Sequence, residues 1–133
     1  MQTFLCYPNF LVSAQCLDDR RLNNQINEAK VIIRVLSGEI DSWKNHPCVR
    51  MWNGYLNALK YYRNCCILEW TYSRNKNNNR ELESFEGVVT FPHWLYDSRL
   101  YLSHRSNLLR KNPTYYSQFN WQVPDNLPYF WPK

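Results

Sequence analysis

Apolar residues recur at helical spacing in the first third of the chain. They are separated by four, three, four and three positions: Leu22, Ile26, Ala29, Ile33 and Leu36. This spacing places them on one face of a helix, which is expected to pack against a core. Ser13 is a suitable N-cap and Gly38 a suitable C-terminal residue, so the pattern predicts one helix between them.

A polar stripe lies beside that apolar face. At about 100° per residue, Arg21, Gln25 and Glu28 fall on one line along the helix. One interpretation is a solvated face with ion pairs such as Asp18 with Arg21, each stabilising the helix by roughly 0.2–0.5 kcal/mol. The other is functional: arginines hold a phosphate backbone, while Glu28 at the rim of the core does acid–base chemistry on a sugar or a base.

A second amphipathic helix is predicted from Pro47 onwards. Proline is accepted in the first turn of a helix, and Asn45 or His46 stands near the cap position. Its inward stripe is mostly aromatic, with spacings of three and four: Trp52, Tyr55, Leu59, Tyr62, Cys66 and Trp70. Two helices with one apolar stripe each are expected to pack on one another.

The segment from residue 73 to residue 92 has no sustained periodicity and predicts a surface loop, with a short extended piece at Val88 and Val89. Leucines then repeat every seven residues, with two apolar neighbours: Leu95, Leu102, Leu109, Tyr101 and Leu108. They predict a third helix, which must end before Pro113 because a proline pushes the preceding residue out of the helical region. The exposed face of this helix is expected to be polar: Arg99, Ser103, His104, Asn107, Arg110 and Lys111.

Basic and aromatic residues are interleaved in the segments SHRSNLLRK (103–111) and PTYY (113–116). This pattern is expected where a protein tracks phosphates and stacks on exposed bases. The alternative is a helix with a solvated face, followed by a tail that closes the core. Arg105 bears on the choice, because it falls on the apolar stripe and should be paired with a carboxylate or held against a ligand.

The last segment, residues 113–133, combines four prolines with seven aromatic rings and cannot form a long helix. Its rings must lie across the helices or across a ligand. The sequence therefore predicts an all-α fold, a compact single-layer bundle of three main helices with an aromatic- and proline-rich C-terminal tail. A chain of 133 residues fits one domain over residues 1–133.

The net charge of +5 and the aromatic content of 17% favour nucleic acid as the partner, although a charge excess can also serve solubility alone. The five cysteines lack C-x-x-C spacing and the three histidines lie far apart, so we expect free thiols, no metal and no cofactor. Neither a signal peptide nor an apolar run of about 20 residues is found, so a cytoplasmic protein without membrane contact is expected. The three glycines form no phosphate loop, which argues against phosphoryl transfer from a nucleotide.

Four segments, LDDRRLNNQINEA, NHPCVRMWNGYLNAL, SHRSNLLRKNPTYY and LPYFWP, resemble the pyrimidine-dimer DNA glycosylase family over most of the chain. Bacterial and viral members of this length are most similar, and the phage glycosylase/lyase called endonuclease V is a more remote likeness. The resemblance implies an enzyme that binds damaged double-stranded DNA, kinks it and flips a nucleotide out. Its expected reaction is cleavage of the N-glycosidic bond of a damaged or modified pyrimidine, with a cyclobutane dimer as the expected lesion.

The resemblance also implies catalytic residues. Glu28 falls on the family's catalytic glutamate, and in the phage enzyme the nucleophile is the α-amino group exposed by removal of the initiator Met. Here the bulky Gln2 usually blocks that removal, so Met1 would supply the amine for a Schiff base and AP-lyase strand cleavage. An α-amino group, with a pKa of about 7.7–8.0, is neutral far more often than a lysine at about 10.4. If Met1 is mispositioned, Glu28 acts with water as a simple glycosylase.

The expected DNA contacts combine the family likeness with the basic and aromatic pattern. They are Gln2, Arg20, Arg21, Asn24, Gln25, Lys30, His104, Arg105, Arg110, Lys111, Tyr115 and Tyr116. Two other classes stay open: a non-catalytic DNA-binding or packaging protein on the same fold, and a protein-interaction module whose aromatic tail docks a partner. Steep salt dependence is expected of DNA binding but not of an interface held by aromatic anchors. We expect a monomer.

Overall fold

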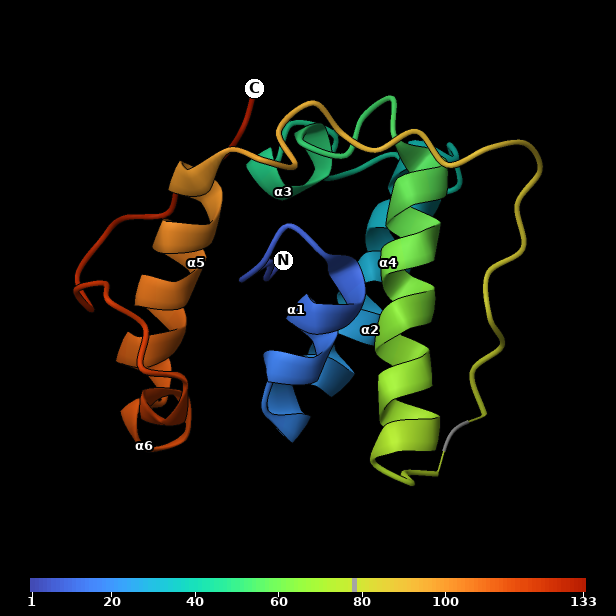
Figure 1. Ribbon diagram of the computed structural model, residues 1–133. Coiled ribbons are helices and arrows are strands. Elements are labelled where there is room, and N and C mark those ends of the chain that lie inside the picture. Colours follow the sequence, from blue (N-terminus) through green and yellow to red (C-terminus); the bar gives the residue numbers. More distant parts are fainter. Residues whose placement is uncertain (78) are drawn as a thin grey trace.

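The computed structural model describes residues 1–77 and 79–133, which form helices and irregular segments without a β-strand (Figure 1). The elements are α1 Phe10–Cys16, α2 Asp19–Leu36, α3 Pro47–Arg50, α4 Leu56–Leu68 with a π-helical turn Glu69–Ser73, α5 Ser98–Lys111, α6 Pro113–Tyr116 and a 3-10 turn Ser117–Phe119. The all-α prediction is confirmed. The three longest helices, α2, α4 and α5, correspond to the three that the sequence predicts.

The first predicted helix is divided in two, so its expected course from Ser13 is wrong. Leu17 is extended and separates α1 from α2, and Asn9 rather than Ser13 caps α1. The Ser13 hydroxyl lies inside α1 and donates to the Tyr7 carbonyl at 2.9 Å. The break is held by Arg74, whose guanidinium donates to the Leu17 carbonyl at 2.6 Å. This partner is distant in sequence, so the helical pattern alone could not reveal it.

Arg74 stabilises this break, so replacing Arg74 should markedly lower the stability of the fold. It also pairs at 2.9 Å with Glu69, whose side chain is 8% exposed. Arg74→Met should therefore lower the free energy of unfolding by about 3 kcal/mol, because a buried carboxylate loses its partner. Urea unfolding measures the loss. Arg34→Met removes an exposed ion pair with Glu39 and should lower the free energy of unfolding by no more than about 0.5 kcal/mol. Equal losses in the two variants would contradict the role of Arg74 at the break.

The second predicted helix is also interrupted. The His46 ring accepts from the Cys48 backbone N–H at 3.1 Å and caps α3. Gly54, at a φ of +87°, then lies in the turn before α4, so the two helices are not continuous. The predicted inward stripe is largely confirmed, because Trp52, Leu59, Tyr62 and Cys66 are buried, whereas Tyr55 and Trp70 are half-buried. As expected, α2 packs against α4.

The surface loop predicted for residues 73–92 is confirmed for residues 74–77 and 79–92, which form no helix or strand, whereas Ser73 belongs to the π-helical turn and residue 78 lies outside the described residues. The described part of the loop runs along the outside of α4 (Figure 1). Buried Arg63 of α4 anchors it through Glu83 at 2.7 Å, and Lys30 of α2 reaches the same carboxylate oxygen at 2.9 Å. The extended piece expected at Val88 and Val89 forms no strand in the described loop.

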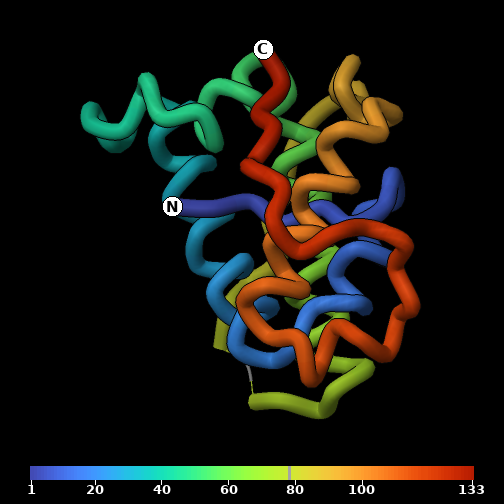
Figure 2. Tube along the Cα trace, turned by 90° about the vertical axis from the view of Figure 1, so that its left-hand side faces the viewer, coloured from blue at the N-terminus to red at the C-terminus, as the bar shows by residue number. Residues whose placement is uncertain are grey.

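Helix α5 ends at Lys111, as predicted, but its buried face differs from the prediction. Leu102 is 39% exposed, while Ser103, His104 and Asn107 are buried. These polar side chains bind backbone groups of the N-terminal segment and of the tail, which runs along α5 in Figure 2. The contacts are His104 Nδ1 with Leu5 N at 2.9 Å, Ser103 Oγ with Phe130 N at 3.1 Å, and Asn107 Nδ2 with Leu127 O at 3.2 Å.

The N-terminal segment, residues 1–7, lies between α5 and the pair formed by α1 and α2 (Figures 1 and 2). Leu5 and Cys6 within it are completely buried and belong to one hydrophobic cluster that also includes Tyr116. The first residues of the chain thereby lie against the polar stripe of α2, where Gln25 binds Gln2 and Phe4. None of the described helices combines the length and apolarity needed to cross a bilayer.

Candidate functional site

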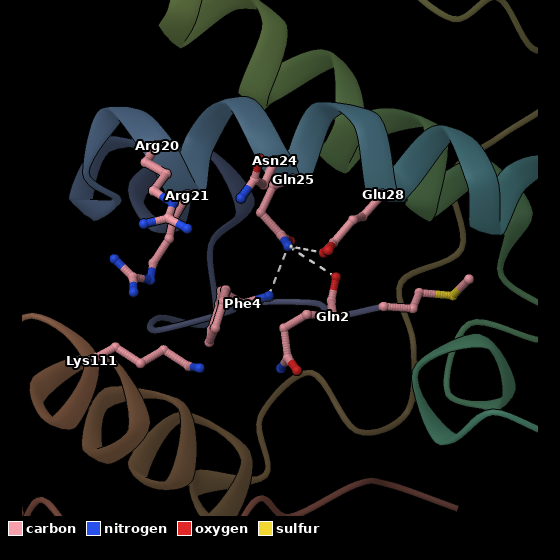
Figure 3. Close-up of a pocket in the computed structure, with 9 residues that line it drawn as sticks. Gln2, Phe4, Arg20, Arg21, Asn24, Gln25, Glu28 and Lys111 are labelled. Atoms are coloured by element: carbon pink, nitrogen blue, oxygen red, sulfur yellow. Dashed lines mark hydrogen bonds between the residues drawn. The ribbon is translucent and has the colours of Figure 1, made fainter.

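A hollow of about 290 Å³ lies between the N-terminal segment, α2 and the end of α5 (Figure 3). Its walls combine one carboxylate with three cationic side chains. The lining residues are Met1, Gln2, Phe4, Arg20, Arg21, Asn24, Gln25, Glu28 and Lys111. Eight of these nine residues are among those expected from sequence, so the structure brings most of the predicted α2 group and the chain start together.

Glu28 is half-buried at the edge of the core, as its place on the helix predicts. Its Oε2 accepts a hydrogen bond from the Gln25 side-chain amide at 3.1 Å. Burial raises the pKa of the Glu28 carboxyl, while the nearby N-terminal ammonium and the Gln2 backbone N–H lower this pKa. The N-terminal ammonium is therefore close enough to stabilise the charged form of Glu28 across the hollow.

The N-terminal segment is held in place by side chains of the surrounding helices. Gln25 of α2 accepts from the Phe4 backbone N–H at 3.0 Å and donates to the Gln2 carbonyl at 2.9 Å. Further along, Arg105 of α5 donates to the Cys6 carbonyl at 2.8 Å. Because these contacts come from two helices, the position of the first residues is set by the packed fold.

The cationic side of the hollow is formed by Arg20, Arg21 and Lys111, which lie away from Glu28 in Figure 3. The predicted pair of Asp18 with Arg21 is present at 3.3 Å. Arg20 and Lys111 are exposed and pair with no acidic side chain of residues 1–77 and 79–133. These two charges are free to meet an anion, which fits the phosphate backbone of DNA.

Six of the expected DNA contacts do not line the hollow, and four of them make other contacts within the protein. Lys30 pairs with Glu83, and Arg110 donates to the Asp125 carbonyl at 3.0 Å. The Arg105 guanidinium lies 4.6 Å from the centre of the Tyr7 ring, so an aromatic ring and a carbonyl replace the carboxylate or ligand expected for it.

The fourth, Tyr115, is half-buried, and its hydroxyl is 3.4 Å from the Leu17 carbonyl. Contacts of Lys30, Arg105, Arg110 and Tyr115 with DNA stay predictions.

Two expected contacts are corrected by the structure. His104 is fully buried, and burial lowers the pKa of its imidazole to about 3, so it is neutral and belongs to the core. Tyr116 is also fully buried; its hydroxyl donates to the Asp18 carboxylate and accepts from the Asp18 backbone N–H at 3.1 Å. Both side chains fasten α2 or the N-terminal segment, so neither is presented to DNA.

Phe4 is the lining residue that the sequence did not reveal. It follows Gln2 by two positions in an extended segment, in which alternate side chains point to the same side. This spacing was the only available signal, and it has meaning only once the segment is known to be extended.

The described residues contain no group of three His, Cys, Asp or Glu side chains that could hold a metal ion. All five cysteines are free and buried. Burial raises the pKa of the Cys48 thiol to about 12, so this group is protonated at neutral pH and makes a poor nucleophile. The groups of the hollow that can act as acid, base or nucleophile are the Glu28 carboxyl, the amine of the chain start and the exposed Lys111 amine.

Comparison with known families agrees with this chemistry. A family model described as pyrimidine dimer DNA glycosylase matches residues 1–84, which is more than half of the chain. The chain therefore belongs to this family of DNA repair glycosylases. Neither a curated protein nor a solved structure matches it. The matched region contains the N-terminal segment and Glu28, whereas α5 with Lys111 lies beyond it.

Proposed function

We propose that this protein removes a damaged or modified pyrimidine, with a cyclobutane dimer as the first candidate, from duplex DNA by cleaving its N-glycosidic bond. We propose further that it acts as a monomer and that the N-terminal amine couples base removal to strand cleavage. One observation carries the proposal: a half-buried carboxyl, Glu28, and the chain start share a hollow with free cationic side chains.

Glu28 has the properties that this reaction requires. The bond between a sugar and a base breaks through a cationic sugar, and a carboxylate held beside C1′ stabilises that charge. Burial raises the pKa of this carboxyl toward neutral pH, where a general acid or base is most effective. Arg20, Arg21 and Lys111 would hold phosphates on either side of the flipped nucleotide.

The amine of Met1 would act as the nucleophile. In its neutral form it attacks C1′, and the bond to the base breaks with its electron pair leaving on the base. The nitrogen loses a proton and O4′ gains one as the sugar ring opens, which leaves an imine between the amine and C1′. Removal of a proton from C2′ then expels the 3′ phosphate and cuts the strand.

The direct test of the proposed activity separates base release from nicking. Duplexes bearing a cyclobutane dimer, a modified cytosine, an abasic site or no lesion are incubated with the purified protein. We expect base release from one of the damaged duplexes, and nicking of both this duplex and the abasic one. Tight binding without any base release would instead support a DNA-binding or packaging protein.

Removal of the free cations should weaken DNA binding in a salt-dependent way. Arg20→Ala combined with Lys111→Ala should make the slope of log affinity against log salt shallower by about 0.9 for each lost phosphate contact. Fluorescence anisotropy from low to moderate salt measures this slope. The matched control is Arg99→Ala, which removes an exposed arginine at the other end of α5, paired with Asp97. An equal change in the control would contradict a specific role of the hollow.

A further inference from the structure

Gln25 occupies the space between the catalytic carboxyl and the N-terminal segment. Its side chain leaves α2 toward the hollow but is only 2% exposed (Figure 3). Both the oxygen and the nitrogen of its side-chain amide have hydrogen-bond partners within the protein. These contacts are Oε1 with Phe4 N at 3.0 Å, Oε1 with the Tyr62 hydroxyl at 2.7 Å, Nε2 with Gln2 O at 2.9 Å and Nε2 with Glu28 Oε2 at 3.1 Å. Gln25 is thus already saturated within the protein, which differs from the DNA contact expected of it.

The orientation of this amide follows from its backbone partners. The Phe4 backbone N–H can only donate, so it must face the amide oxygen, and the Gln2 carbonyl can only accept, so it must face the amide nitrogen. The second N–H of Gln25 is then directed at Glu28. One planar group therefore fixes the carboxyl and the backbone of residues 2–4 relative to each other.

Tyr62 holds Gln25 from the side of the core. Its ring is buried in α4, and its hydroxyl lies 2.7 Å from Gln25 Oε1 and 2.9 Å from the Phe4 carbonyl. Because the hydroxyl has a single proton, it can donate to only one of these two acceptors at a time. The packing of α4 on α2 therefore determines the position of the Gln25 side-chain amide.

We propose that Gln25 is a positioning residue that holds the Glu28 carboxyl and the N-terminal amine at a fixed separation for reaction at one sugar. The catalytic roles of Glu28 and of the N-terminal amine rest on the proposed function. The hydrogen bonds through which Gln25 links Glu28 to the N-terminal segment do not depend on it. The amide N–H stabilises the ionised carboxyl, so it opposes the effect of burial. Without it, the carboxyl becomes harder to ionise and the chain start loses its tie to α2.

Gln25→Met tests the proposal, because methionine is similar in length and makes no comparable hydrogen bonds. The pKa of the Glu28 carboxyl, followed by NMR titration of side-chain carboxyl carbons, should rise by about one unit. Single-turnover base release should slow about a hundredfold, as expected when reacting groups shift by about 1 Å. DNA binding should stay within about threefold, since Gln25 itself is not exposed.

Ser13→Ala is the matched control. It removes the hydroxyl that binds Tyr7 in the same segment but leaves Glu28 and its neighbours intact. This variant should keep both the carboxyl pKa and the rate of base release. A role of Gln25 limited to fastening the segment would predict similar effects of both variants.

Gln25→Glu is a second variant that preserves shape in case the methionine variant does not fold. It keeps an acceptor for the Phe4 N–H but replaces the donor toward Glu28 by a second carboxyl, so the Glu28 pKa should also rise. An unchanged Glu28 pKa in either folded variant would overturn the positioning role, even if the wild-type protein is active. If the Gln25 variants raise the Glu28 pKa but the wild-type protein releases no base, the positioning role is supported and the proposed function is refuted.

Discussion

Glu28→Gln should abolish base release while leaving DNA binding nearly intact. Glutamine has the same shape and can still accept the hydrogen bond that Gln25 donates, so the hollow should keep its form. It cannot carry the negative charge that stabilises a cationic sugar, and we expect the single-turnover rate to fall by about a thousandfold. Binding measured by anisotropy on the same damaged duplex should change by no more than about threefold.

Glu39→Gln is the control for this change. Glu39 follows the end of α2, is exposed and pairs with Arg34 at 3.1 Å, far along the helix from the hollow. The variant should release base at the wild-type rate. If Glu28→Gln also released base at the wild-type rate, Glu28 would not take part in the reaction. Another residue would then have to perform the family's chemistry.

An extension of the chain ahead of Met1 should abolish strand nicking. Two extra residues move the α-amino group away from Glu28 and add bulk to a hollow of about 290 Å³. Because the imine requires an amine beside C1′, nicking of the abasic duplex should fall by about a hundredfold or more. The assay resolves cleaved from intact strands on denaturing gels without alkaline treatment.

Base release by the extended protein separates two mechanisms. If it falls together with nicking, the amine is the nucleophile that displaces the base. If it persists at the wild-type rate, Glu28 activates water and the protein is a simple glycosylase. Nicking at the wild-type rate would contradict any role of the chain start, and a lysine would then be the more suitable candidate.

Features that depend on neighbouring positions along the chain could be predicted from sequence. The apolar and polar stripes of α2 follow from helical geometry alone, so Glu28 is found at the edge of the core, with Arg21 and Gln25 beside it. The cap of α3 at His46 and the end of α5 before Pro113 are local in the same sense. Backbone restrictions and helix periodicity determine such features almost independently of the rest of the fold.

Features that depend on distant partners could not be predicted. The break at Leu17 is stabilised by Arg74, which is 57 positions further along the chain. His104 was expected on the exposed face of α5, yet its ring accepts a hydrogen bond from Leu5, 99 positions earlier. A polar side chain that satisfies a buried backbone group has the same pattern in sequence as one that faces water. The tertiary contact alone distinguishes them.

The most direct test of the account is to trap the reaction intermediate. Borohydride added during reaction with the damaged duplex would reduce an imine to a stable covalent bond, and peptide mapping by mass spectrometry would locate the linkage. The account predicts an adduct on the α-nitrogen of Met1 that is strongly reduced in Glu28→Gln. An adduct on a lysine side chain, or none from a preparation that nicks DNA, would contradict it.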